Sequence, residues 1–296
     1  MNNKIGIHYA YWGDQWDVDL LERIRLAADA GCNDLEVTPP DYMVQMDRSR
    51  MDELKTCAED NGVEMSFCIG FPQSKDMASE DPNIRQAGIE HSKRMLESVN
   101  YMGGKILSGI LYSWWPYLFT KVITPEYKRD CWKRGVESVQ KVIPVAESYG
   151  ITYAIEMVNR FEQFIVNSVD EGIAFCKDVD SPNAGILLDV FHANIEENSI
   201  ADSIRRAGSH IAHVHFSENN RRLPGTGNHI PWKDIAAALK DIHYTGRLVL
   251  EPFVAAGGPV GTDLRIWRNL DADVSPEARQ EALRKSVQFV QELMSE

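Results

Sequence analysis

Four acidic or imidazole side chains each close a short apolar segment in the second half of the chain. They are Glu156 in ITYAIE, Asp189 in AGILLD, His215 in IAHVHF and Glu251 in RLVLE. In a barrel of parallel strands, the C-terminal ends of the strands meet at one rim, where such folds carry their chemistry. Carboxylates with one imidazole predict a divalent-metal site there. A single acid at a strand end can simply face solvent, but four in succession favour the metal site.

Two carboxylates on one metal ion suit the removal of a proton next to a carbonyl group. The metal acts as a Lewis acid on the carbonyl oxygen, which makes the neighbouring C–H more acidic. One carboxylate removes the proton. A second carboxylate on the opposite face of the carbon can return a proton there and invert the centre.

Other polar residues follow the same strand ends. In HVH, His213 and His215 share one face of a strand, and His215 is nearer the rim. We therefore expect His215 to be the ligand and His213 to be a hydrogen-bonded histidine inside the barrel. His192 and Arg221 can donate charge-assisted hydrogen bonds to a substrate oxygen.

Strand and helix patterns alternate eight times along the chain. The predicted strands are Ile5–Ala10, Asp34–Val37, Val63–Ile69, Lys105–Leu111, Ile151–Glu156, Gly185–Leu188, Ile211–Phe216 and Arg247–Glu251. Amphipathic segments such as Val18–Ala30, Asn83–Met102 and Pro125–Tyr149 separate them. This alternation predicts an α/β protein, a (β/α)8 barrel, with residues 1–296 as a single domain.

Helix ends and long loops complete this outline. Gly31, Gly62 and Gly150 stand where a helix would end in a left-handed residue. Ser275-Pro276-Glu277 would open a C-terminal helix over about 276–294. Two long loops, Tyr112–Thr124 and Phe253–Asp273, would lie on the catalytic rim and could cover a substrate.

Composition excludes several classes of partner. The net charge of −13 argues against nucleic acid and against anionic membranes. No apolar segment approaches the roughly 20 residues that span a bilayer, and the N-terminus resembles no secretory signal. Five scattered cysteines without a CxxC pair indicate a reduced protein, so we expect a cytoplasmic location.

Several segments together are similar to one enzyme family. IEMVNRFE, LDVFHAN, HVHFSENNRRLPG and LEPF, with the N-terminal YAYW, CIGFP and the WP after the fourth strand, resemble the ketose 3-epimerases. This family includes D-tagatose 3-epimerases and D-psicose (D-allulose) 3-epimerases, within the xylose-isomerase-like barrels. The resemblance runs over essentially the whole chain, and it depends on the combination of motifs.

The resemblance implies a specific reaction. It implies C3 epimerisation of free ketohexoses (D-fructose and D-psicose, D-tagatose and D-sorbose) through a cis-enediolate, with Glu156 and Glu251 as the acid/base pair. It implies one Mn²⁺ or Co²⁺ per subunit, held by Glu156, Asp189, His215 and Glu251. It also implies a homodimer or homotetramer.

The resemblance further implies how the sugar is held. Glu162, His192 and Arg221 would bind its O1–O2 end. A more apolar wall around the C4–C6 end would consist of Trp16, Cys68, Ile110, Trp115 and Phe253. His8 departs from the family, whose members usually carry Phe or Tyr there. Its imidazole could hydrogen-bond a terminal hydroxyl group, which places the substrate preference in question rather than the reaction.

Other functions stay open at this point. The same barrel could be a hydroxypyruvate isomerase, a hexulose-phosphate epimerase, an inosose dehydratase or an L-ribulose 3-epimerase. A phosphosugar enzyme would need more basic residues at the rim, and a repair endonuclease would need more histidines and a basic face. A non-catalytic sugar-binding barrel would normally have lost one of the four ligands, and all four are present.

Overall fold

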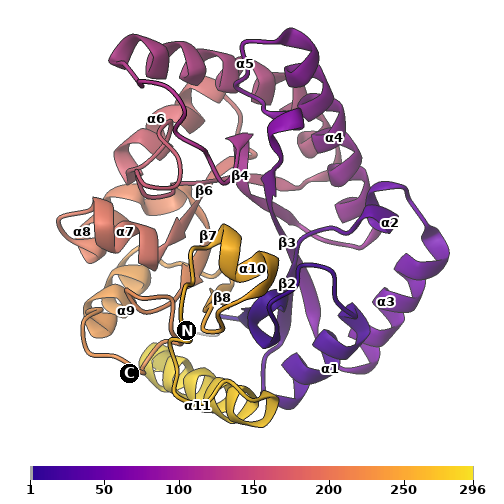
Figure 1. The fold of residues 1–296 in the computed structure, drawn as a ribbon, viewed down its shortest axis with the longest axis vertical. Coiled ribbons are helices and arrows are strands. Elements are labelled where there is room, and N and C mark those ends of the chain that lie inside the picture. The colour runs from indigo at the N-terminus through magenta and orange to yellow at the C-terminus, as the bar shows by residue number, and fades with distance from the viewer. Residues whose placement is uncertain (1–2, 296) are drawn as a thin grey trace.

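Eight parallel strands form a closed barrel in the order β1 to β8, and Figure 1 shows the strands in the middle of the molecule. The structure is a computed structural model, and it describes residues 3–295. The strands are β1 Ile5–His8, β2 Asp34–Val37, β3 Glu64–Phe71, β4 Ile106–Trp114, β5 Thr152–Glu156, β6 Ala184–Asp189, β7 Ile211–Phe216 and β8 Leu248–Leu250. The predicted (β/α)8 barrel is confirmed, and the strands β2 and β7 have the predicted bounds.

Helices surround the barrel on all sides (Figure 1). They are α1 Leu20–Asp29, α2 Asp41–Val44, α3 Arg48–Asp60, α4 Pro82–Tyr101, α5 Pro125–Tyr149, α6 Val169–Val179, α7 Val190–Glu196, α8 Ile200–Ala207, α9 Trp232–Asp241, α10 Gly258–Asp263 and α11 Pro276–Ser295. Three short 3-10 turns are η1 Tyr9–Trp12, η2 Gln73–Lys75 and η3 Gly208–His210. The C-terminal helix α11 lies between α9 and α1 and so closes the ring.

The helix ends follow the local signals in the sequence. Gly31, Gly62 and Gly150 have φ angles of 86°, 67° and 60°, in the left-handed region that glycine adopts without steric cost. The hydroxyl of Ser275 accepts a hydrogen bond from the Ala278 backbone N–H, 3.3 Å away, at the start of α11. These short-range signals therefore set where the helices stop and start.

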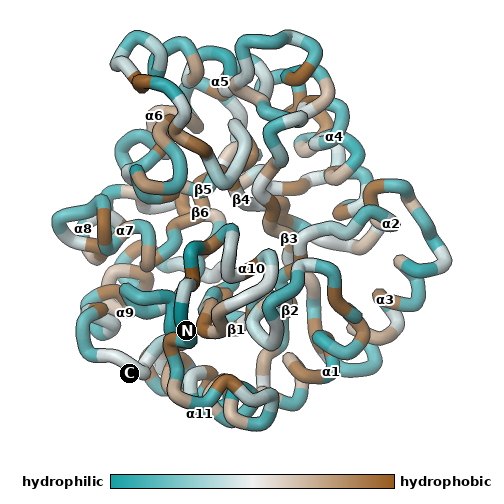
Figure 2. Tube along the Cα trace, in the orientation of Figure 1, coloured by the Kyte–Doolittle hydropathy of each residue, from teal (hydrophilic) through white to brown (hydrophobic). Residues whose placement is uncertain are grey.

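The strands are buried because helices cover their outer faces and the barrel closes around their inner faces. The apolar residues of β5 to β8 are buried, except Ala184 and Ala212, which are partly exposed. Figure 2 shows the same segregation, with hydrophilic residues gathered on the outer helices and hydrophobic residues toward the strands. Any charged side chain inside this barrel needs a partner, because an isolated buried charge is very costly.

The predicted loop Tyr112–Thr124 is wrong at its beginning, because Tyr112 to Trp114 continue β4. β3 and β4 run on together beyond a register shift at Gly70 and Phe71, where Phe71 pairs with Trp114. The backbone N–H of Trp115 then donates a hydrogen bond to the Phe71 carbonyl, 2.9 Å away. The aromatic residues that suggested a loop favour strands as well. The second predicted loop contains α10.

None of the helices within residues 3–295 is both long enough and apolar enough to cross a membrane.

Candidate active site

A cavity of about 470 Å³, open to solvent, lies at the C-terminal end of the barrel. Every residue expected to bind substrate lines it, together with both expected acid/base glutamates: His8, Trp16, Cys68, Ile110, Trp115, Glu156, Glu162, His192, Arg221, Glu251 and Phe253. The sequence reasoning missed five further lining residues, namely Thr38, Ile69, Gly70, Val158 and Leu264.

The four expected metal ligands lie at this end of the barrel, and two of them, Glu156 and Glu251, line the cavity. Glu156 and Asp189 end β5 and β6, His215 pairs in register with Asp189, and Glu251 directly follows β8. All four are buried. His215 Nδ1 lies 3.4 Å from Glu251 Oε1 and 4.0 Å from Asp189 Oδ2. One ligand atom each from Asp189, His215 and Glu251 lie within 4.8 Å of one another, and the same holds for Glu156, Asp189 and His192.

The Arg221 guanidinium lies between two of these carboxylates. Its Nη1 is 2.6 Å from both Asp189 Oδ2 and Glu251 Oε2, and its Nη2 is 3.1 Å from His192 Nε2. Arg221 has a φ of 63°, an uncommon backbone conformation for a residue other than glycine. The loop after β7 therefore adopts a left-handed backbone conformation at Arg221, the residue whose guanidinium contacts Asp189 and Glu251.

Two observations fit a divalent cation at this place. His215 Nδ1 is fully buried and makes no hydrogen bond to any residue within 3–295. The guanidinium already places a positive charge between Asp189 and Glu251. Carboxylate oxygens with one imidazole nitrogen are a ligand set that Mn²⁺ and Co²⁺ accept.

The two glutamates of the cavity are in opposite electrostatic environments. Burial, reinforced by the charge of Glu251, raises the pKa of Glu156 well above its usual range. Burial would also raise the pKa of Glu251, but the positive charges of His215 and Arg221 lower it well below its usual range. Carboxylates whose pKa values are separated in this way suit the roles of acid and base in one site.

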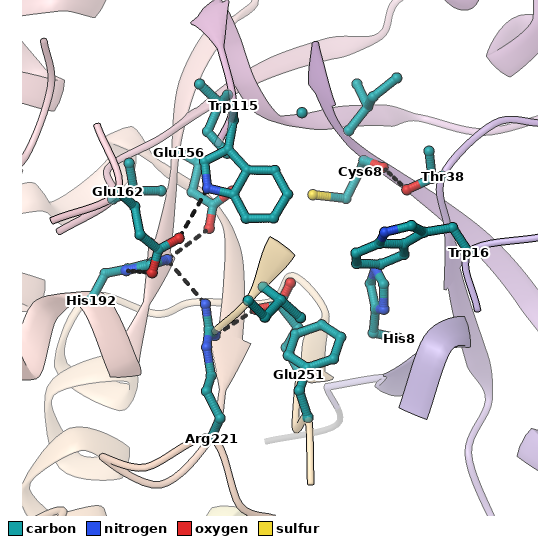
Figure 3. A pocket seen from close by; sticks show the side chains of 16 residues that line it. His8, Trp16, Thr38, Cys68, Trp115, Glu156, Glu162, His192, Arg221 and Glu251 are labelled. Atoms are coloured by element: carbon teal, nitrogen blue, oxygen red, sulfur yellow. Dashed lines mark hydrogen bonds and ion pairs between the residues drawn. The ribbon is translucent and has the colours of Figure 1, made fainter. Parts of the chain in front are cut away.

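Hydrogen bonds fix the polar side of the cavity, as Figure 3 shows. The Trp115 indole N–H donates to Glu162 Oε2 at 2.9 Å. The Asn159 side-chain amide lies 2.9 Å from Glu162 Oε1 and 2.8 Å from His192 Nδ1. Burial lowers the pKa of His192, which favours its neutral form. Glu162 and His192 are therefore held in place before any substrate arrives.

The opposite side of the cavity is aromatic (Figure 3). The His8 ring meets those of Phe253 and Trp16 edge-on, at centroid distances of 5.4 and 6.3 Å. His8 Nδ1 accepts a hydrogen bond from the Ala10 backbone N–H, 3.4 Å away, so the proton of the neutral ring is on Nε2. Trp16 is held by its indole N–H, which donates to Asp263 of α10 at 2.8 Å.

Two residues that neighbour site residues in the sequence, Trp114 next to Trp115 and His213 near His215, do not line the cavity, and His213 was expected to lie inside the barrel. Trp114 packs against Tyr117, with ring centroids 4.9 Å apart, so only Trp115 of this pair lines the cavity. His213 lies deeper in the barrel, with Nε2 2.6 Å from Glu36 Oε2. The sequence reasoning did not single out Glu36. The sequence does contain a sign of it: Glu36 is an acid within a short predicted strand, and a barrel buries both faces of such a strand.

The chain matches the family model described as xylose isomerase-like TIM barrel over residues 24–292. It is 39% identical over 285 residues to a D-psicose 3-epimerase of Ruminiclostridium cellulolyticum, covering 96% of this chain and 94% of that protein. It is 36% identical to a D-psicose 3-epimerase of Agrobacterium fabrum, covering 97% of each. The chain belongs to the ketose 3-epimerases of the xylose isomerase-like TIM barrel family.

Solved structures agree with this assignment. A D-psicose 3-epimerase determined in the presence of D-fructose superimposes with a TM-score of 0.94 at 35% identity, covering 99% of this chain and all of that one. A D-psicose 3-epimerase with D-tagatose, from Clostridium cellulolyticum H10, also gives 0.94, at 37% identity over 98% of this chain and 99% of that one. The chain is therefore an isomerase of carbohydrates that acts as a ketose 3-epimerase.

Proposed function

We propose that this ketose 3-epimerase interconverts free ketohexoses at C3, D-fructose with D-psicose and D-tagatose with D-sorbose, and that it depends on a divalent metal ion. The observation that carries the proposal is the pair Glu156 and Glu251, two buried carboxylates that line one cavity, at the end of β5 and directly after β8. Similarity to D-psicose 3-epimerases, one of them determined with D-tagatose, supports these substrates.

The chemistry of each residue follows from its place. Glu156, Asp189, His215 and Glu251 would hold one Mn²⁺ or Co²⁺ per subunit. The bound ion would act as a Lewis acid on the ketose oxygens and make the C3 proton more acidic.

One glutamate removes the C3 proton, and the electron pair moves toward C2 to give a cis-enediolate. The other glutamate then donates a proton to the opposite face of C3, which inverts the centre. For the opposite epimer the two carboxylates exchange their roles.

The remaining cavity residues would orient the sugar. Glu162, His192 and Arg221 form the polar end of the cavity and would bind O1 and O2. The residues that would face C4 to C6 are His8, Trp16, Cys68, Ile110, Trp115 and Phe253. Among these, Trp115 lies on the polar side, beside Glu162. A homodimer or homotetramer and a cytoplasmic location stay predictions from the sequence.

Exchange of the C3 proton with solvent tests this mechanism. In D₂O the wild type should place deuterium at C3 of each product. Glu156→Gln and Glu251→Gln should each lower epimerisation by about 10²–10⁴-fold, the usual contribution of a general acid or base. The glutamate that remains should still exchange the C3 proton of one epimer. Product that contains no deuterium at C3 would contradict the mechanism.

A further inference from the structure

Glu36 of β2 reaches across the inside of the barrel to two histidines of β7. Its side chain has no solvent exposure. Oε2 lies 2.6 Å from His213 Nε2, and Oε1 lies 2.7 Å from His215 Nε2. β2 and β7 are not neighbouring strands, because β8 and β1 lie between them in the sheet. The contact is therefore made through the barrel interior rather than along the sheet.

The contact with His215 joins two atoms that have no other polar partner. Glu36 Oε1 and His215 Nε2 are both fully buried, and neither makes an aligned hydrogen bond within residues 3–295. At 2.7 Å they are close enough for one, and a small turn of the imidazole would align it. Buried polar atoms of native proteins nearly always have a hydrogen-bonding partner, so Glu36 Oε1 and His215 Nε2 are assigned to each other as partners.

The arrangement has a direct consequence for the opposite ring nitrogen. A neutral histidine carries its proton on one nitrogen and a lone pair on the other. If Nε2 holds the proton toward Glu36, then Nδ1 presents its lone pair. Nδ1 is the atom that lies 3.4 Å from Glu251 and 4.0 Å from Asp189.

We propose that Glu36 is a positioning residue that holds His215 in the Nε2–H form with Nδ1 free to bind the metal ion. The proposal rests on the metal site proposed above. His213 anchors Glu36 by occupying its second oxygen. Partners of this kind, on the far side of a metal-binding histidine, typically affect metal affinity by about 10- to 100-fold.

Metal affinity tests the proposal with a matched control on the same strand. Glu36→Met keeps an unbranched side chain of similar length and removes both acceptor oxygens. Asp34→Asn changes another fully buried carboxylate of β2, which contacts Ser66 and Arg247 and neither histidine. Titration of metal-free protein with Mn²⁺, followed by the electron paramagnetic resonance signal of free Mn²⁺, gives the affinities.

We expect Glu36→Met to bind Mn²⁺ about 10- to 100-fold more weakly than the wild type. Asp34→Asn should lower the thermal stability but leave the Mn²⁺ affinity within about threefold, because it is outside the contact shell of His215. Equal affinities for Glu36→Met and the wild type would overturn the role of Glu36. Equal losses in both variants would assign the effect to general destabilisation and overturn it as well.

A second measurement does not depend on the Glu36→Met variant. Nitrogen-15 spectra of the histidine-labelled wild type, loaded with diamagnetic Zn²⁺ in place of Mn²⁺, show which ring nitrogen of His215 keeps its proton, and His215→Gln assigns the signal. The Nε2–H form of His215 is expected, and the Nδ1–H form would overturn the proposal even if Glu36→Met does not fold. If the wild type epimerises ketoses and binds Mn²⁺, and Glu36→Met binds Mn²⁺ equally well, then only the role of Glu36 is refuted. A wild type that binds no metal refutes the proposed metal dependence too.

Discussion

Replacing His8 with phenylalanine tests how the cavity selects its sugar. The Nδ1 atom of His8 is occupied by the Ala10 backbone, and Nε2–H makes no hydrogen bond to the residues of 3–295. On this aromatic side of the cavity the indole of Trp16 is already engaged with Asp263. Nε2–H is therefore a free donor toward the C4–C6 end of a bound ketose, and phenylalanine keeps the ring but removes the donor.

The expected magnitude is that of one hydrogen bond between neutral groups. Such a bond contributes about 0.5–1.5 kcal/mol, which corresponds to roughly a 2- to 13-fold change in kcat/KM. His8→Phe should lose this factor on a ketose whose terminal hydroxyl reaches Nε2. It should lose nothing on an analogue without that hydroxyl, because neither protein can then form the bond.

The assay compares kcat/KM of wild type and His8→Phe on D-psicose and on 6-deoxy-D-psicose. The ratio of the two substrates should shift toward the deoxy sugar in the variant, while turnover persists. His8→Gln retains an amide donor and should recover part of the preference for D-psicose. An equal loss on both sugars would refute the reasoning, because His8 would then act through packing alone.

Three further predictions concern stability and electrostatics. Arg221→Ala should destabilise the metal-free protein by about 3–5 kcal/mol, because it leaves buried carboxylates without their cation. Saturating Mn²⁺ should therefore raise the Tm of this variant more than that of the wild type, and equal shifts would contradict this. Burial and the charge of Lys75 lower the pKa of His91 to about 4, from 6.5. As pH falls from about 6.5 to 4, the unfolded chain takes up this proton before the folded chain does, so stability should fall in the wild type. His91→Gln should remove that part of the pH dependence in urea unfolding, and parallel curves for the two proteins would count against it. Chelation with EDTA should lower the Tm of the wild type, and excess Mn²⁺ should restore it. Free Mn²⁺ at 100 times Kd should raise the free energy of unfolding by about 2.7 kcal/mol. A Tm that neither treatment changes would argue against a bound ion.

The barrel and the positions of its metal-site residues were predictable because both follow from local patterns. Parallel strands buried on both faces read as apolar segments, so the charged residue that ends each one stands out. Glu156 and Asp189 end such segments, His215 is the last residue but one of its strand, and Glu251 follows a strand directly. Closure of the barrel then brings the four strand ends to one rim.

The features that sequence reasoning missed depend on contacts between distant segments. Glu36 and His215 are 179 positions apart in the chain, and they meet only because closure of the barrel brings β2 opposite β7. Thr38 and Leu264 reach the cavity through the paths of their loops. Tyr112 was assigned to a loop because its aromatic neighbours suit a lid as well as a strand, and the pairing of Phe71 with Trp114 decides between the two.

Conversion of D-fructose by the metal-stripped protein, with and without added Mn²⁺, tests the central claim most directly. Sugar chromatography should show D-psicose when Mn²⁺ is present and none when the metal is absent. Equal D-psicose formation without metal would contradict the proposed metal dependence. No product from fructose, psicose, tagatose or ribulose, with Mn²⁺ demonstrably bound, would contradict the proposed epimerisation itself.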